Sequence, residues 1–163
     1  MTGPTKPASG PPRRTPALVL INWLLLAAVV VVAADKVAVP LRPSVNEAAI
    51  AKSMPVGSVE YIDRMRPPGR LFNSYNWGGY LAWTLYPAYP VYIDGRTDLY
   101  GDAFLRRYLR IVGGQEGSQA ALDQDGIRLV LIETGSPLAA ALRRAPDWRL
   151  SYADSLASVF ERR

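Results

Sequence analysis

The sequence predicts an α/β protein: a single N-terminal transmembrane helix, then a small mixed, mainly parallel sheet with flanking helices and a C-terminal β-hairpin. Three observations lead to this fold class. An apolar run occupies residues 17–34. Short apolar segments alternate with amphipathic ones over residues 56–144, a pattern typical of helices packed on a parallel sheet. Two strand-like segments close the chain around a turn at Asp154-Ser155, as in a β-hairpin.

The apolar run at residues 17–34 is long enough to cross a bilayer. At roughly 1.5 Å per residue, a helix of this length spans about 27 Å, close to the hydrocarbon thickness of a membrane. Lys6, Arg13 and Arg14 precede it without any acidic residue, which places the N-terminal flank in the cytoplasm. The alternative is a cleaved signal peptide with Val32-Ala33-Ala34 as its cleavage site. We favour the anchor because the run is longer than a typical signal-peptide core.

These features divide the chain into four parts. Residues 1–16 are rich in proline and small polar residues and predict a disordered cytoplasmic tail. Residues 17–34 form the transmembrane helix, and residues 35–55 form a connector that contains a short helix near its end. Residues 56–163 form an extracytoplasmic α/β domain. The expected location is the cell membrane, with a single pass and the domain on the outer side.

Periodicity and capping residues place the elements of the domain. Strands are expected at residues 70–73, 91–94 and 127–132, a hairpin at residues 148–152 and 156–161, and helices at residues 56–66, 77–86, 102–112, 118–124 and 137–144. The helix at 102–112 has a clear apolar face, which consists of Phe104, Leu105, Tyr108, Leu109 and Val112. Asp102 and Ser136 are expected to cap the helices that they precede.

Composition excludes several classes of enzyme and of binding protein. The chain has no cysteine and no histidine, which excludes Ser-His-Asp and Cys-His mechanisms and the common zinc sites. The net charge is +5, and the first sixteen residues contribute three of these charges. Because a nucleic-acid-binding domain concentrates positive charge on its folded part, we expect no nucleic-acid partner. We also expect no cofactor, no metal site and no catalytic residue.

Two polar segments follow two of the predicted strands. They are Asn73–Tyr80 and Asp94–Asp102. The carboxyl ends of neighbouring parallel strands meet in one crevice, so we expect the two segments to share a cleft. The candidate ligand-binding residues are Tyr75, Asn76, Trp77, Asp94, Arg96 and Asp98. Aromatic rings beside carboxylates and a guanidinium suit a sugar or a phosphate.

The same residues also allow structural roles. Trp77 and the two aromatic residues that follow it at helical spacing fit a hydrophobic core. Asp94 and Arg96 fit a structural ion pair, and Asp94 with Asp98 fits a divalent-cation site. The sequence leaves these alternatives open.

The segment around the two loops also resembles a known group of proteins. Residues 69–101, GRLFNSYNWGGYLAWTLYPAYPVYIDGRTDLYG, resemble the extracytoplasmic C-terminal domain of bacterial GT-C-type glycosyltransferase-like membrane proteins, which use polyprenyl-phosphate sugars. The later segments 126–131 and 159–160 resemble the strand and hairpin that close such domains. The stretch Tyr75 to Gly79 is faintly similar to the Trp-Trp-Asp-Tyr-Gly motif of the oligosaccharyltransferase catalytic subunit. Trp77 stands at the place of that aspartate, so peptide recognition is not carried over.

The resemblance implies an accessory role rather than a complete enzyme. GT-C-type enzymes carry their catalytic acid in a loop between early transmembrane helices, and this chain has one predicted span. We therefore expect a membrane-anchored, non-catalytic accessory domain of a lipid-linked sugar transfer or cell-envelope glycosylation system. Its expected partners are the bilayer, a polytopic membrane protein and a glycan or polyprenyl-phosphate sugar. The alternatives are a structural module that docks on a polytopic membrane partner and a small metal-assisted hydrolase. Whether the chain is complete or the tail of a split transferase stays open.

Overall fold

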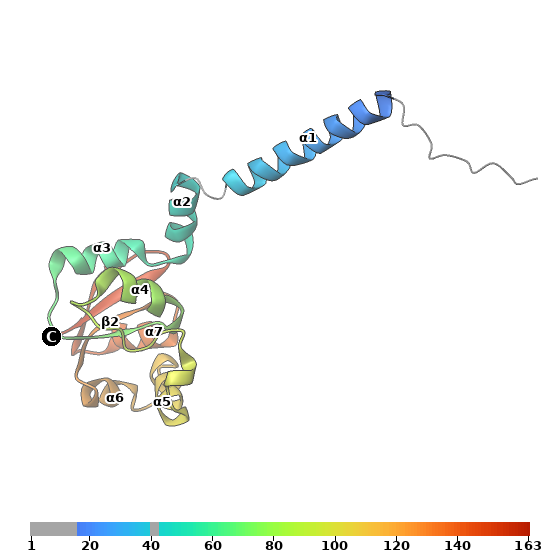
Figure 1. The fold of residues 1–163 in the computed structure, drawn as a ribbon. Helices are drawn as coiled ribbons and strands as arrows, with labels where there is room; N and C mark the ends of the chain where they lie inside the picture. Colours follow the sequence, from blue (N-terminus) through green and yellow to red (C-terminus); the bar gives the residue numbers. More distant parts are fainter. Residues whose placement is uncertain (1–15, 40–42) are drawn as a thin grey trace, which may run out of the picture. The chain divides into compact units, whose positions relative to one another are not determined.

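The structure is a computed structural model that describes residues 16–39 and 43–163. It contains two compact units, Met1–Glu47 and Ala48–Arg163. Within the described part of the first unit, helix α1 (Pro16–Ala38) covers the predicted span at residues 17–34 and continues for one further turn (Figure 1). None of its side chains is buried. By length and composition it is the one helix among the described residues that can cross a membrane.

Helix α2 (Pro43–Ser53) begins in the first unit and ends in the second. It is the helix that the sequence placed near the end of the connector. The predicted disorder of residues 1–16 lies outside the described residues, apart from Pro16, which begins α1. The predicted connector, residues 35–55, therefore contains the end of α1 and the whole of α2.

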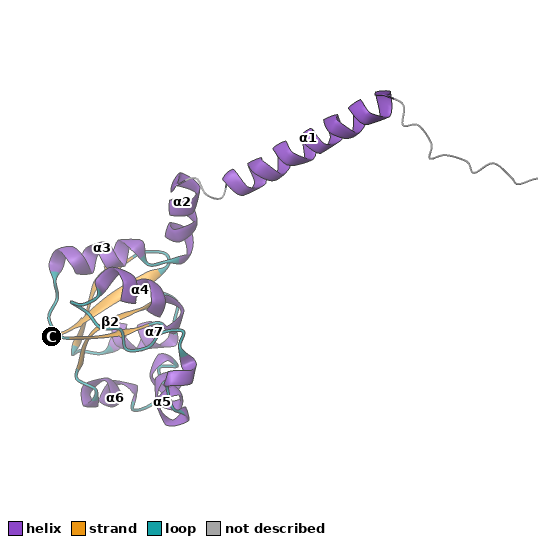
Figure 2. Cartoon of the chain, viewed as in Figure 1, coloured by secondary structure: helices purple, strands orange, loops and turns teal. Residues whose placement is uncertain are grey.

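The second unit contains the α/β fold. Its elements are α3 (Val56–Met65), β1 (Arg70–Asn73), the 3-10 helix η1 (Tyr75–Trp77), α4 (Gly78–Leu85), the 3-10 helix η2 (Thr97–Leu99), α5 (Asp102–Val112), α6 (Ser118–Gln124), β2 (Ile127–Glu133), α7 (Pro137–Arg144), β3 (Trp148–Ala153) and β4 (Ala157–Arg162). Strands β3 and β4 form the predicted C-terminal hairpin. Figure 2 shows the strands between helices, as expected for this class.

The four strands form a mixed sheet in the order β1-β2-β4-β3. Strands β1 and β2 are parallel, with Phe72 opposite Val130. The pairs β2–β4 and β3–β4 are antiparallel. The predicted mixed sheet is confirmed, but parallel pairing is confined to one pair, because the final hairpin supplies two of the four strands.

Helices cover both faces of the sheet, since alternate side chains of each strand point to opposite sides. One face carries Leu71, Leu129, Leu131 and Val159, and it packs against α3 and α4. The other carries Phe72, Val130, Ile132 and Phe160, and it packs against α5, α6 and α7. We call these the α3–α4 face and the α5–α7 face. In Figure 1 they lie on opposite sides of the strands.

The segment at residues 91–94 is not a strand, contrary to the prediction. It runs beside the end of β1, but the Asn73 side chain takes the place of a neighbouring strand. The Asn73 Oδ1 atom accepts hydrogen bonds from the backbone N–H groups of Tyr92 (2.8 Å) and Ile93 (3.4 Å). One side chain therefore satisfies backbone groups that a strand ladder would otherwise pair.

The two predicted helix caps have different outcomes. Ser136 caps α7, because its hydroxyl accepts a hydrogen bond of 3.2 Å from the Ala139 N–H. Asp102 does not cap α5. Gly101 is at the N-cap, and Asp102 instead lies in the first turn, 3.8 Å from the Arg106 guanidinium. A carboxylate in a first turn still interacts favourably with the helix dipole.

Candidate functional site

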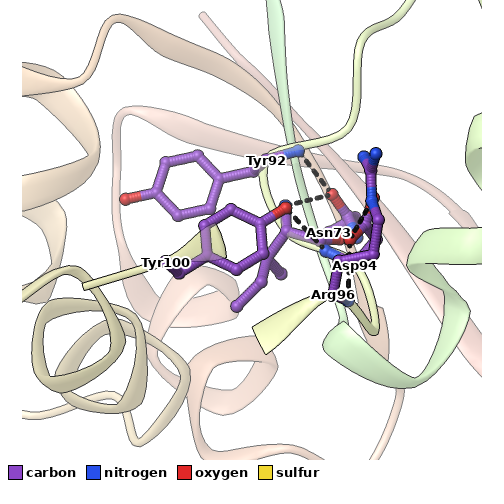
Figure 3. A network of polar contacts seen from close by, with 6 residues as sticks. Asn73, Tyr92, Asp94, Arg96 and Tyr100 are labelled. Carbon is purple, nitrogen blue, oxygen red and sulfur yellow. Dashed lines mark hydrogen bonds and ion pairs between the residues drawn. The ribbon is translucent and has the colours of Figure 1, made fainter. Parts of the chain in front are cut away.

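The two polar loops lie side by side at the end of β1. The Asn73 Nδ2 group donates hydrogen bonds of 2.8 Å to the carbonyl oxygens of Ser74, in the first loop, and Ile93, which directly precedes the second. Figure 3 shows the Asn73 amide beside the backbone of Tyr92. The side chain is fully buried, and its amide joins the two loops in the way that the sequence predicts for neighbouring segments.

The start of α4 packs directly on the second loop. A Cβ atom added to Gly78 would lie 2.5 Å from the Asp94 Cα atom and would also overlap the Ile93 carbonyl oxygen. Only a residue without a side chain allows this approach. By contrast, a Cβ atom on Gly79 would meet nothing within 4 Å. The two adjacent glycines therefore have different roles.

Asp94 is buried and tied to its own loop. It is 4% exposed, and its carboxylate accepts hydrogen bonds from the Arg96 side chain at 3.1 Å (Nε) and 2.6 Å (NH2) and from the Arg96 backbone N–H at 3.0 Å. The Asp94 N–H donates to the Tyr100 hydroxyl at 3.2 Å (Figure 3). Hydrogen bonds from Arg96 hold the pKa of Asp94 below its usual range. The structural ion pair that the sequence left open is the observed arrangement.

Trp77 belongs to the core of the α3–α4 face. It is 3% exposed, and its indole Nε1 donates a hydrogen bond of 3.1 Å to the carbonyl oxygen of Ser53. Leu81, one helical turn further on, is buried in the same cluster, whereas Trp83 is 80% exposed. In this structure neither Trp77 nor Asp94 reaches solvent, so their predicted contact with a ligand does not fit their burial.

The other four predicted residues are accessible to different degrees. Tyr75 is half-buried, and Asn76, Arg96 and Asp98 are exposed. The Tyr75 N–H donates a hydrogen bond of 2.7 Å to the Tyr108 hydroxyl of α5. Burial raises the pKa of that hydroxyl to about 12, so it stays protonated at neutral pH. The first loop is thereby fixed to the α5–α7 face.

An open groove lies where the two loops meet α5. It has a volume of about 260 Å³ and is lined by Tyr75, Ile93, Thr97, Leu105, Tyr108 and Leu109. We call it the α5 groove. Of the six predicted ligand residues only Tyr75 lines it, while Thr97 lies between the predicted Arg96 and Asp98. The lining is apolar, which suits an apolar ligand or an apolar part of a larger one.

Glu133 is a polar residue of this region that the sequence reasoning missed. It ends β2, and its Oε1 atom accepts hydrogen bonds from the Ser74 hydroxyl at 2.5 Å and from the Asn76 amide at 3.3 Å. The cluster lies at the carboxyl ends of the parallel strands β1 and β2. The convergence rule that selected the first loop applies equally to the end of β2, so this acid was within reach of the sequence reasoning.

The geometry gives no support to a metal site at Asp94 and Asp98. Both carboxylate oxygens of Asp94 accept hydrogen bonds from Arg96. In the part of the chain that the structure describes, no three or more His, Cys, Asp or Glu side chains gather in a way that would hold a metal ion. The metal-assisted hydrolase that was predicted as an alternative therefore lacks a ligand set there.

Comparison with known proteins returns no relative: no protein family, curated protein or solved structure matches the chain.

Proposed function

We propose that the chain is a non-catalytic, membrane-tethered, extracytoplasmic accessory domain of a lipid-linked sugar transfer or cell-envelope glycosylation system. In this proposal the α5 groove holds part of a polyprenyl-phosphate sugar. The observation that carries the proposal is the convergence of the two loops on one open apolar groove beside α5. The resemblance of residues 69–101 to domains of such transferases supplies the substrate class.

The chemistry of the groove fits an amphipathic ligand. Its apolar lining suits isoprenoid units, and the rings of Tyr75 and Tyr108 suit the apolar face of a sugar. Exposed polar side chains follow the lining residues in the sequence: Asn76 comes after Tyr75, and Arg96 and Asp98 flank Thr97. A guanidinium is a strong partner for phosphate. In this proposal Arg96 and Asn76 contact the phosphate and the sugar hydroxyls.

Helix α1 fits this role because the substrate is a membrane lipid. Its length and composition allow it to cross a membrane. As an anchor it keeps the domain next to the layer in which a polyprenyl chain is dissolved. Tethering raises the effective concentration of the domain at its substrate without any additional contact.

Ligand binding by the full chain in detergent micelles tests the proposal. The probes are a short-chain polyprenyl-phosphate sugar and the corresponding polyprenyl alcohol. Leu109→Glu introduces a charge at a residue that lines the groove and is 62% exposed, so the fold is maintained. Leu150→Glu, at another exposed leucine on β3, is the matched control. We expect at least about tenfold weaker binding for Leu109→Glu and unchanged binding for the control, because a charge must be desolvated in the apolar groove.

Equal affinity in the wild type and in Leu109→Glu would remove the groove from the proposal. Binding of the alcohol as strongly as the phosphate sugar would remove the role of Arg96 and Asn76. Loss of binding in both leucine variants would indicate a general effect of added charge rather than a site.

A second candidate is the structural module that docks on a polytopic membrane partner. The observation that favours it is the burial of Trp77 and Asp94 together with the apolar lining of the groove, since apolar grooves also accept protein side chains. Under this alternative, the full chain binds no polyprenyl-phosphate sugar. A membrane protein then co-purifies with the wild type and with Leu150→Glu but not with Leu109→Glu.

A further inference from the structure

The outer side of α4 combines exposed aromatic rings with an absence of charge. No Asp, Glu, Lys or Arg occurs between Leu71 and Ile93. Within this stretch Trp83 is 80% exposed and Tyr86 is 72% exposed. A helix that is apolar on all sides is normally buried on all sides. The exposed side of α4 is therefore suited to an environment other than bulk water.

Helices α3 and α4 form one layer, with both helices running in the same direction. At their start, the Trp77 indole donates to the carbonyl oxygen of Ser53, which ends α2 just before α3. Beyond their far end, the Tyr89 hydroxyl donates a hydrogen bond of 2.7 Å to the carbonyl oxygen of Pro67. We call the half-buried Tyr80 and the exposed Met65, Trp83 and Tyr86 of this layer the aromatic surface.

The aromatic surface has the composition of a membrane interface. The Tyr80 and Trp83 rings contact each other, with centroids 6.5 Å apart. Tryptophan and tyrosine favour the headgroup region of a bilayer, because each has an apolar ring and a polar group that stays hydrated. The cations Lys52 on α2 and Arg64 on α3 are exposed next to this layer, and α3 also exposes the acids Glu60 and Asp63, of which Asp63 pairs with Arg66. Such cations pair with lipid phosphates while their stems cover apolar surface.

The chain itself brings this surface near a bilayer. Only residues 39–42 separate α1 from α2, and α2 ends at Ser53. Ser53 is hydrogen-bonded to Trp77, which directly precedes α4. Helix α4 therefore begins at the point where the connector from the membrane-spanning helix joins the domain. Under the proposed function, the tether keeps the domain close to a lipid surface.

We propose that the aromatic surface of the α3–α4 face binds the lipid–water interface of the membrane that α1 spans. The contact orients the domain on the bilayer, so that α4 lies against the headgroups and the α5 groove, on the other face of the sheet, stays open to its ligand. This proposal rests on the tether in the proposed function, but not on the ligand of the groove.

Site-directed spin labelling of the full chain in phospholipid nanodiscs tests the contact. The chain has no cysteine, so single cysteines can be introduced without removing others. Gly79→Cys places a label one turn before Trp83, and Gly101→Cys places the control label at the start of α5. A Cβ atom at either position meets nothing within 4 Å. The measurement is the collision of each nitroxide with oxygen, which partitions into lipid, and with a water-soluble nickel complex.

We expect the label at position 79 to collide several-fold less with the nickel complex than the label at position 101, and more with oxygen. Trp83→Ser combined with Tyr86→Ser should remove this difference. Both residues are exposed, so circular dichroism should show an unchanged fold. Restored nickel collisions in a folded double variant would show that the rings hold the contact.

Three outcomes would overturn the proposal. If chains retained on nanodiscs show equal collision profiles at positions 79 and 101, the membrane contact is refuted, while the tether and the proposed function are unaffected. Protection of position 79 from both reagents would indicate a protein contact, such as a second copy of the chain. Chains that elute free of nanodiscs would refute the tether, and with it both this inference and the membrane part of the proposed function.

Discussion

The two faces of the sheet are alike on the inside, but α4 on one face and α5 on the other differ on the outside. Both are packed with aliphatic and aromatic side chains, led by Leu81 on one side and Leu122 on the other. On the outside, α5 exposes Arg106 and Arg110 to solvent, whereas α4 exposes Trp83 and no charge. Packing on the sheet constrains only the inner side of a helix. The outer composition is free of that constraint and therefore carries information about what surrounds the domain.

The faces also differ in how their helices are connected. On the α5–α7 face, the Arg107 guanidinium lies 2.9 Å from Asp125, which also accepts a hydrogen bond of 2.8 Å from the Tyr92 hydroxyl. Burial and the bond to Asp125 raise the pKa of Tyr92 to about 12. Helix α4 has no charged residue with which to form such a pair. Electrostatic changes at Asp125 should therefore act on α5 and α6 and leave α4 unchanged.

Among the polar side chains, the largest effect is expected at Asn73, which lies where the two faces meet. Asn73→Ala leaves the buried Tyr92 N–H and Ile93 carbonyl without partners. An unpaired buried polar group costs about 1 to 3 kcal/mol, so the free energy of unfolding should fall by about 3 kcal/mol or more. Urea denaturation in mild detergent, followed by tryptophan fluorescence, measures it. Asn76→Ala, at an exposed side chain with one bond of 3.3 Å, is the control, and an equal loss there would contradict the special role of Asn73.

A second, smaller effect separates the two glycines at the start of α4. Gly78→Ala forces apart α4 and the loop at Asp94, because the new Cβ atom would lie 2.5 Å from the Asp94 Cα atom. Overpacking of this kind destabilises by about 1 to 3 kcal/mol. Gly79→Ala meets open space and should be neutral or stabilising by up to about 1 kcal/mol. Thermal unfolding of the pair gives the comparison, and similar shifts for both would show that the close approach tolerates a side chain.

The pH dependence that Asp125 contributes should be local to α5 and α6. Burial alone would raise the pKa of Asp125, but hydrogen bonds from Arg107 and Tyr92 and the charge of Arg107 outweigh it, so the pKa lies below its usual range. Because the unfolded pKa is about 3.9, this stabilisation is complete above about pH 4 and is lost as the pH falls through the folded pKa. Asp125→Asn should lower the free energy of unfolding by about 1 to 2 kcal/mol at pH 7 and flatten its decline in acid.

Hydrogen exchange at pH 7 and pH 3 locates that effect. Amides of α5 and α6 should lose protection in acid in the wild type and show a weaker dependence in Asp125→Asn. Amides of α4 should respond alike in both proteins. An equal loss of protection across α4 and α5 would mean that the two faces unfold as one unit, and the electrostatic contrast between them would then have no local consequence.

Local pattern was enough to predict most of the elements. Ser136 followed by Pro137 identified the start of α7, and the continuous apolar run at Ile127 predicted β2, because both signals depend on residues close in sequence. The segment at Val91 has the same apolar character but is not a strand. Its backbone partner is the side chain of Asn73, and no local pattern identifies so distant a partner.

The candidate site was predicted in its position but only partly in its residues. The two loops do lie side by side, but not for the predicted reason: residues 91–94 are not a strand, and the Asn73 side chain joins that segment to the end of β1. The sequence does not show which of the two tryptophans is buried, because either Trp77 or Trp83 could lie on the inner side of so short a helix. Only the contact of Trp77 with Ser53 assigns it to the interior. Glu133 was missed because the convergence rule was applied to the ends of the strands at 70–73 and 91–94 but not to the end of β2.

The smallest effect on stability is expected at the largest exposed side chain. Trp83→Ser should change the free energy of unfolding by less than about 0.5 kcal/mol, as is usual for exposed positions, because Trp83 is 80% exposed. The same change at Trp77 should cost about 3 to 5 kcal/mol, since that ring is buried. Urea denaturation in detergent measures both, and a large loss at Trp83 would assign it to the core. A small loss would show that folding does not require the Trp83 ring, which leaves it available for the membrane contact proposed above.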